Sequence, residues 1–125
     1  MSASDVPADD RTEAARALSD SEVEALVDAF VEAAIRCARA GLDGVELHGA
    51  HGYLISQFLG TKTNRRTDRW GGDVPGRARF LQAIIAGIRA ATAPDFLIAV
   101  RLSPVLPDVG AVSYTHLTLP TTPYV

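Results

Sequence analysis

The chain has 125 residues, of which 47% are hydrophobic and 22% charged, and its formal net charge is −3. This composition indicates one globular domain and excludes a wholly disordered or collagen-like chain. The mildly acidic balance argues against a nucleic-acid partner, which usually requires a basic patch, and the single cysteine, Cys37, excludes an internal disulfide.

No apolar run approaches the ~20 residues that a membrane-spanning helix needs. Residues 1–11 are polar and include Asp5, Asp9 and Asp10, so they lack the basic and then apolar order of a secretion signal. We therefore expect no membrane association and a cytoplasmic location, which the single cysteine also favours.

Residues 1–18 follow no sustained period, and we interpret them as a flexible lead. Ser19, with Glu22 three residues later, predicts a capping box at the start of a helix. Apolar residues then recur at helical spacing as far as Gly41, a residue typical of the position just beyond a helix. This apolar stripe comprises Val23, Leu26, Val27, Phe30, Ala34 and Cys37.

Residues 44–48 predict a short strand in which Val45 and Leu47 alternate with Glu46 and His48. A glycine-rich turn, a short helix over 53–59 and a polar loop over 60–76 follow. The pattern then predicts a second long helix over 77–91 and a second strand over 96–102. Helices that alternate with strands in this order are typical of a parallel α/β sheet.

In both predicted strands one face is wholly apolar, and it should pack against the helices. The other face carries Glu46, His48 and Arg101. Charged side chains inside a parallel sheet are costly unless they are paired or bind something. This face therefore holds the candidate functional residues.

His48, His51 and Tyr53 are the main candidates because they follow a strand end among glycines. A neutral imidazole can donate to a substrate carbonyl, and a phenol can deliver a proton. Active sites of α/β folds gather at the carboxyl ends of strands. The plainer alternative is a buried histidine satisfied by a backbone carbonyl, beside a tyrosine that only packs.

A metal site is a second alternative, since His48, His51 and Glu46 are suitable ligand types. His51, however, lies beyond a turn, and no further carboxylate or cysteine follows nearby. We therefore predict no metal.

Arg101 is a fixed cation near the end of an apolar strand, and it could neutralise an anion in the pocket. The alternative is an ion pair with Glu46 on the neighbouring strand, and both can hold together. In the polar loop we expect Asn64, Arg65, Arg66 and Asp68 to form a self-contained network.

Residues 105–125 differ from the rest of the chain. Their last stretch, SYTHLTLPTTPYV, carries no charge and follows no helical period. We interpret this segment as a non-homologous tail, typical of translated adapter or frame-shifted sequence.

An ordered set of motifs over about residues 15–104 closely resembles the old yellow enzyme family of FMN-dependent ene-reductases. The motifs are AGLDGVELHGAHGYLISQFL, TNRRTDRWGG, RARF and VRLSP. The resemblance implies a TIM barrel, with this chain matching its middle: a helix, the fourth strand, an excursion, a helix and the fifth strand. A tryptophan, Trp70, stands where the family usually has tyrosine, and Gly76 replaces a common asparagine, which removes a local side-chain cap.

The resemblance also implies roles at the matched positions. His48 and His51 would donate hydrogen bonds to the substrate's carbonyl, and Tyr53 would protonate its α-carbon. Arg101 would contact the flavin near its N1–C2=O edge. The implied cofactor is FMN, the reductant NAD(P)H, and the substrate a small α,β-unsaturated molecule. The parent enzyme could be a homo-oligomer.

A TIM barrel needs at least ~200 residues. The fold class we predict is therefore α/β: a partial TIM (β/α)8 barrel, with about two strands and flanking helices from the barrel's middle. Its parts would be a lead (1–18), the barrel fragment (19–104) and the tail (105–125), and this truncated chain alone should be inactive. Two other functions stay open, namely a standalone αβ binding module without catalysis and a fragment of a metal-dependent hydrolase.

Overall fold

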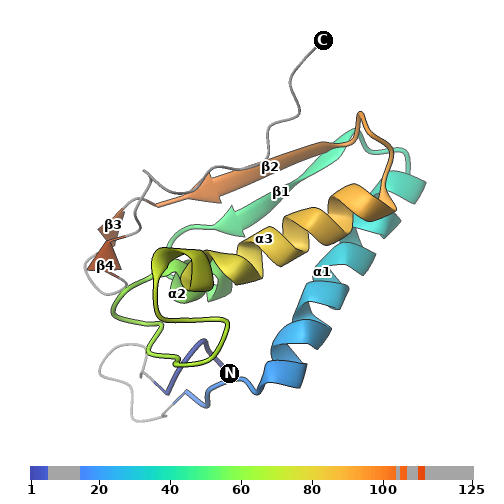
Figure 1. The fold of residues 1–125 in the computed structure, drawn as a ribbon. Helices are drawn as coiled ribbons and strands as arrows, with labels where there is room; N and C mark the ends of the chain where they lie inside the picture. The colour runs from blue at the N-terminus through green and yellow to red at the C-terminus, as the bar shows by residue number, and fades with distance from the viewer. Residues whose placement is uncertain (6–14, 104, 107–109, 112–125) are drawn as a thin grey trace.

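The computed structural model of the chain describes residues 1–5, 15–103, 105–106 and 110–111. Three helices and two short pairs of strands make up these ranges (Figure 1). In chain order they are α1 (Asp20–Arg39), β1 (Gly44–Gly49), α2 (Leu54–Leu59), α3 (Val74–Ala91), β2 (Leu97–Leu102), β3 (Val105–Leu106) and β4 (Gly110–Ala111).

Helix α1 begins and ends where its sequence signals predict. The Ser19 side chain accepts from the Glu22 N–H at 3.2 Å, and the Glu22 carboxylate accepts from the Ser19 N–H at 2.8 Å. These bonds satisfy two donors that a helix N-terminus leaves without intrahelical partners. At the other end Gly41 has a φ of +83°, which glycine adopts at little cost. The predicted capping box is confirmed.

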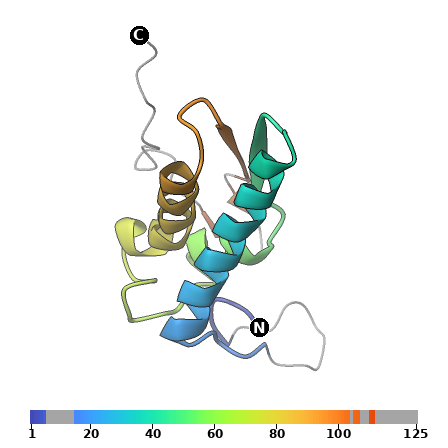
Figure 2. The same cartoon turned by 90° about the vertical axis from the view of Figure 1, so that its right-hand side faces the viewer.

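Strands β1 and β2 pair in parallel, and α1 and α3 lie side by side on one face of them (Figures 1 and 2). The register pairs Val45 with Ile98 and Leu47 with Val100, so the apolar residues share the face that packs against the helices. The core under this face centres on Phe58, Phe80 and Ile84, all fully buried. The predicted α/β class, with two parallel strands and flanking helices, is confirmed.

Helix α3 begins at Val74, whereas we predicted a loop through residue 76. Asp73 is the reason: its carboxylate accepts from the Gly76 N–H at 2.9 Å and caps the helix. Pro75 fits in the first turn, where its missing N–H costs nothing. The cap expected to be lost with Gly76 is therefore supplied by Asp73.

The loop between α2 and α3 is held by buried polar contacts. Asn64 donates to the carbonyls of Phe58 at 2.6 Å and Trp70 at 2.8 Å. Arg66 forms an ion pair with Asp68 at 2.5 Å, and its N–H donates to the Asn64 side-chain oxygen at 3.1 Å. Arg65 instead donates to Ser4 and to the Lys62 carbonyl, so three of the four expected residues form the predicted network. It is not self-contained, because Arg66 also donates to the Leu18 carbonyl at 2.6 Å and to that of Ala3 at 3.1 Å.

The described parts of the predicted lead, residues 1–5 and 15–18, pack against this loop. Ser2 and Ala17 form a parallel bridge, and Ala3 and Leu18 are buried in the core. Trp70 ties the same loop to α1, because its indole N–H donates to Asp20 at 2.5 Å. Its ring also meets Phe80 edge-on at 6.5 Å, so the tryptophan at this position is a packed core residue.

Strands β3 and β4 pair antiparallel and belong to the predicted tail, most of which lies outside the described residues. Across the described ranges, no helix has both the length and the apolar character that crossing a membrane requires.

Replacing Gly76 by alanine should destabilise the fold. An added Cβ would lie 2.0 Å from the Gly71 carbonyl oxygen, a backbone atom that cannot move aside. We expect Gly76→Ala to lower the free energy of unfolding by about 2 kcal/mol in urea titrations followed by the fluorescence of Trp70. The matched control is Gly87→Ala in the same helix. Its Cβ would meet the side chain of Val31, which can shift, so its effect should stay within about 1 kcal/mol. Equal losses in the two variants would contradict this account.

Glu22 should make the stability of the chain depend on pH. Its hydrogen bonds from Arg16 and from the Ser19 N–H lower the pKa of Glu22 from 4.5 to about 2. A carboxylate with a lowered pKa stabilises the fold fully above its unfolded pKa and loses that effect as the pH falls toward its folded pKa. We therefore expect the urea midpoint to fall between about pH 5 and pH 2 less steeply in Glu22→Gln than in the wild type. Glu32→Gln, an exposed change on the same helix, should leave the slope unaltered. Parallel curves for Glu22→Gln and wild type would exclude this role.

Candidate active site

The end of β1 and the turn after it place the candidate side chains. His48 is the fifth residue of β1, and Tyr53 precedes the first residue of α2. Between them the chain reverses through two residues in the left-handed region, His51 at φ 58° and Gly52 at φ 75°. For glycine this conformation costs little, but a residue with a Cβ adopts it only where its surroundings hold it.

Two hydrogen bonds that involve side chains hold this turn. The His51 N–H donates to the Ser103 hydroxyl at 3.2 Å, and the Gln57 side chain donates to the Gly52 carbonyl at 2.9 Å. Ser103 follows β2 and Gln57 lies in α2, so both neighbouring elements fix the turn. Sequence reasoning missed both residues. Their one available signal was their place in VRLSP and HGYLISQFL, the motifs that carry the family resemblance.

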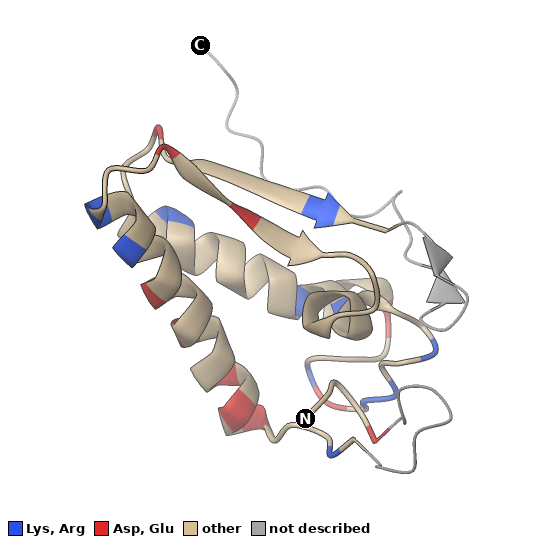
Figure 3. Ribbon diagram, turned by 180° about the vertical axis from the view of Figure 1, so that it is seen from behind, with Lys and Arg blue, Asp and Glu red and all other residues tan. Residues whose placement is uncertain are grey.

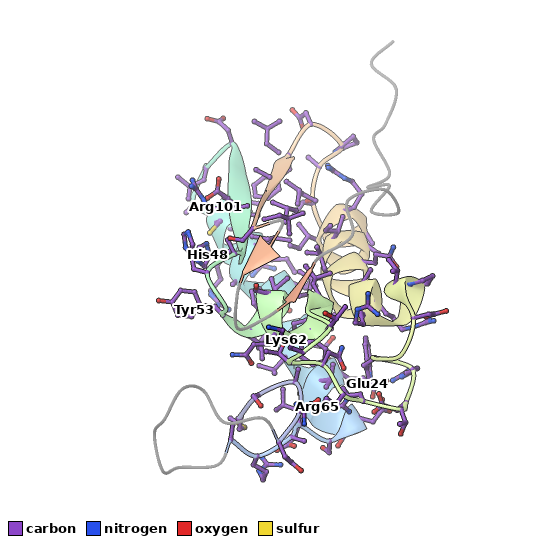
Figure 4. All side chains as sticks on the ribbon, turned by 90° about the vertical axis from the view of Figure 1, so that its left-hand side faces the viewer. Glu24, His48, Tyr53, Lys62, Arg65 and Arg101 are labelled. Carbon is purple, nitrogen blue, oxygen red and sulfur yellow. The ribbon has the colours of Figure 1, made fainter. Side chains whose placement is uncertain are left out.

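The turn brings the three predicted side chains together. The ring centres of His48 and His51 are 5.1 Å apart, and those of His48 and Tyr53 are 5.4 Å apart. All three side chains are exposed, Tyr53 at 63%, so the alternative of a buried, satisfied histidine does not apply to His48. In Figure 4, Arg101, His48 and Tyr53 follow one another along one side of the molecule.

Arg101 stands opposite His48 in the strand register, but its guanidinium reaches Glu46. Arg101 Nε lies 2.9 Å from Glu46 Oε1, and the two residues belong to the paired strands β2 and β1. Figure 3 shows a blue segment on one of these strands and a red segment on the other. The hydrogen bond from Arg101 lowers the pKa of the Glu46 carboxyl. The ion pair predicted as an alternative for Arg101 is therefore present, which leaves a further role for the cation open.

No cluster of three or more His, Cys, Asp or Glu side chains in the described part of the chain could hold a metal ion. Glu46, the third ligand considered at the sequence level, is instead bonded to Arg101.

The chemistry of this face suits an anionic or carbonyl-bearing ligand. The histidine rings offer N–H donors, Tyr53 offers a phenol, and Arg101 is charged at every physiological pH. This donor set fits the electron-rich N1–C2=O edge of a flavin beside a polarised substrate. Ala99 leaves only a methyl group on the same face of β2, between Leu97 and Arg101, and all three side chains are exposed.

A model of the NADH:flavin oxidoreductase / NADH oxidase family matches residues 1–110. The chain belongs to this family. The predicted resemblance to FMN-dependent NADH:flavin oxidoreductases is confirmed, and the match extends past residue 104, where we expected it to stop.

Similar proteins from this family are known at the level of sequence and structure. The chain is 47% identical over 112 residues to the probable NADH-dependent flavin oxidoreductase YqiG of Bacillus subtilis, covering 86% of this chain and 30% of that protein. It resembles the old yellow enzyme homologue from Zymomonas mobilis with a TM-score of 0.72 and 39% identity, over 82% of this chain and 28% of that one. Morphinone reductase in complex with tetrahydroNAD also matches with a TM-score of 0.72 and 40% identity, over 80% of this chain and 27% of that one.

The chain therefore spans less than a third of the length of these family members. Its two parallel strands and their helices correspond to part of the old yellow enzyme TIM barrel.

Removing the Ser103 hydroxyl should loosen the turn that carries His51. We expect the amide hydrogen of His51 to exchange about fivefold faster in Ser103→Ala, because one hydrogen bond contributes about 1 kcal/mol. NMR-detected hydrogen exchange on the whole chain measures this. Ser103→Thr keeps the hydroxyl and should restore slow exchange. An unchanged rate at His51 in Ser103→Ala would show that the hydroxyl does not hold the turn.

Proposed function

We propose that this chain is the substrate-polarising and proton-donating part of an FMN-dependent oxidoreductase that uses NAD(P)H to reduce activated alkenes such as enones. The observation that carries the proposal is the cluster of His48, His51 and Tyr53 at the carboxyl end of β1, with ring centres 5.1 and 5.4 Å apart. Membership of an FMN-dependent family supports the choice of cofactor.

The histidine pair would bind the substrate's carbonyl or other electron-withdrawing group. His48 projects from the end of a strand and His51 from the turn, so two N–H donors reach one acceptor from different parts of the backbone. Negative charge builds on that oxygen as the alkene is reduced, and donors already in place stabilise it without reorganisation. The bonds to Ser103 and Gln57 keep one of these donors in position.

Tyr53 would supply the proton to the substrate's α-carbon. Its backbone N–H donates to the Ala50 carbonyl, and its own carbonyl accepts from the Gln57 N–H, so the residue is fixed at the start of α2. The exposed phenol can then reach a substrate held by the histidines, since its ring centre lies 5.4 Å from that of His48. A positioned acid of this kind typically contributes ~10²–10⁴-fold in rate.

Arg101 would hold the flavin at its anionic N1–C2=O edge. When bound, FMN supplies hydride chemistry that no side chain offers. Morphinone reductase, to which the chain is similar, was solved with tetrahydroNAD, which supports a nicotinamide reductant. Residues 19–104 would form the barrel part, and of the proposed tail, residues 105–125, the family match includes the first six.

Tyr53→Phe tests the function in the barrel-length enzyme that contains this segment, obtained by amplifying the source DNA outward from the codons for residues 1–104. We expect alkene reduction to slow by ~10²–10⁴-fold. Flavin reduction by NADH or NADPH should change little, because it needs no proton from Tyr53. Stopped-flow absorbance of the flavin measures the two half-reactions separately.

The flavin-reduction rate of the same variant is the internal control for folding and cofactor loading. Equal losses in both half-reactions, or a barrel-length protein that binds no FMN, would refute the proposed function. A chain that instead unfolds cooperatively as a monomer and binds no flavin would favour the standalone binding module.

A further inference from the structure

We propose that Glu46 is a positioning residue that holds the guanidinium of Arg101 in place for the flavin, an inference that rests on the proposed function. Glu46 and Arg101 lie on the sheet face opposite the helices, the face that also carries His48. The ion pair is not part of the core, because the apolar residues of both strands pack on the other side.

The Arg101 side chain contacts Glu46, which is not the residue directly opposite it on β1. In the register Arg101 stands opposite His48, and Glu46 stands opposite Ala99. Arg101 therefore reaches back by two residue pairs along the sheet, to the preceding pair on the same face, with Nε 2.9 Å from Oε1 and Nη2 3.5 Å from Oε2 of Glu46. Among the described residues, Glu46 is the sole acceptor of hydrogen bonds from the Arg101 side chain.

This arrangement uses one edge of the guanidinium and leaves the rest available. Glu46 accepts from Nε and Nη2, so Nη1 and the second hydrogen of Nη2 can donate to another group. An arginine side chain has many rotamers, and fixing one of them before a ligand arrives removes that entropic cost from binding. Ala99, the preceding residue on the same face of β2, is small and exposed, so it does not block the guanidinium.

The flavin reduction potential distinguishes two roles of Glu46, namely holding Arg101 in position and acting through its own negative charge. A cation held at the N1–C2=O edge stabilises the reduced, anionic flavin and so raises its reduction potential. A carboxylate near the flavin, taken by its charge alone, lowers that potential. Removal of Glu46 therefore lowers the potential if Glu46 acts through Arg101, and raises it if Glu46 acts only as a charge.

The test compares Glu46→Ala with Glu46→Gln in the FMN-loaded, barrel-length enzyme. Both changes remove the same charge, but glutamine keeps an acceptor oxygen for Arg101. We expect the ratio of affinities for reduced and oxidised FMN, obtained from the reduction potential, to fall about fivefold in Glu46→Ala and less in Glu46→Gln. The control is Glu24→Gln, which removes a partner of another arginine, Arg69. Glu24 lies in α1, far from Arg101 (Figure 4), so this change should leave the reduction potential unaltered.

Repeating the Glu46→Ala change in a variant that lacks Arg101 tests the sign of its effect on the reduction potential. In Arg101→Met the cation is absent, so adding Glu46→Ala should raise the potential, the reverse of its effect beside Arg101. In the 125-residue chain itself, the Arg101 Nε–H signal in ¹H–¹⁵N NMR should lose its protection from exchange in Glu46→Ala. This readout needs no cofactor.

An unchanged or raised potential in Glu46→Ala beside Arg101 would overturn the proposal, as would equal values for the alanine and glutamine variants. The outcome is separable from that of the proposed function. If the potentials follow the expected signs but alkenes are not reduced, Glu46 positions Arg101 in an enzyme of another substrate class. If Tyr53→Phe behaves as expected and the potentials do not, the function stands and the role of Glu46 fails.

Discussion

The parallel pairing of β1 with β2 is the constraint on which the other features depend. Two parallel strands need a long crossover, and here that crossover is α2, the polar loop and α3. Because α1 and α3 cover one face, the alternation of side chains divides each strand into an apolar set that packs and a polar set that does not. His48 and Arg101 belong to the second set by parity alone. The polar face exists because the other face builds the core.

The crossover also contains the polar loop between α2 and α3, whose hydrogen bonds help to hold the elements around the site. The loop before α3 lies against the start of α1. Arg66 donates a hydrogen bond to the Leu18 carbonyl there, and Trp70 donates one to Asp20. Asn64, buried at 6% exposure, joins α2 to the loop by donating to the backbone carbonyls of Phe58 and Trp70. These contacts stabilise α2 from outside, and α2 in turn supplies Gln57 to the turn that carries His51. The rigidity of the site is therefore set partly by residues that never reach it.

Sequence reasoning predicted the features that depend on short-range patterns. The capping box of α1 was readable because Ser19 and Glu22 are three residues apart, and the two strand faces were readable from alternation. The start of α3 was not, because the cap by Asp73 and the close approach of Gly76 to Gly71 emerge only in three dimensions. The grouping of the histidines with Tyr53 was predicted, whereas the bond from His51 to Ser103 joins residues 52 positions apart and left no local pattern.

The left-handed backbone at His51 limits what this position can become over evolutionary time. Most side chains are strained at a φ of 58°, and the residues that tolerate it well are glycine, asparagine, aspartate and, to a lesser degree, histidine. Of these, asparagine also carries an uncharged N–H donor. Replacement between histidine and asparagine therefore keeps both the turn and the hydrogen bond, whereas almost every other substitution sacrifices one of them. The backbone conformation of this turn thus leaves about two residue types that can both adopt it and donate a hydrogen bond at position 51.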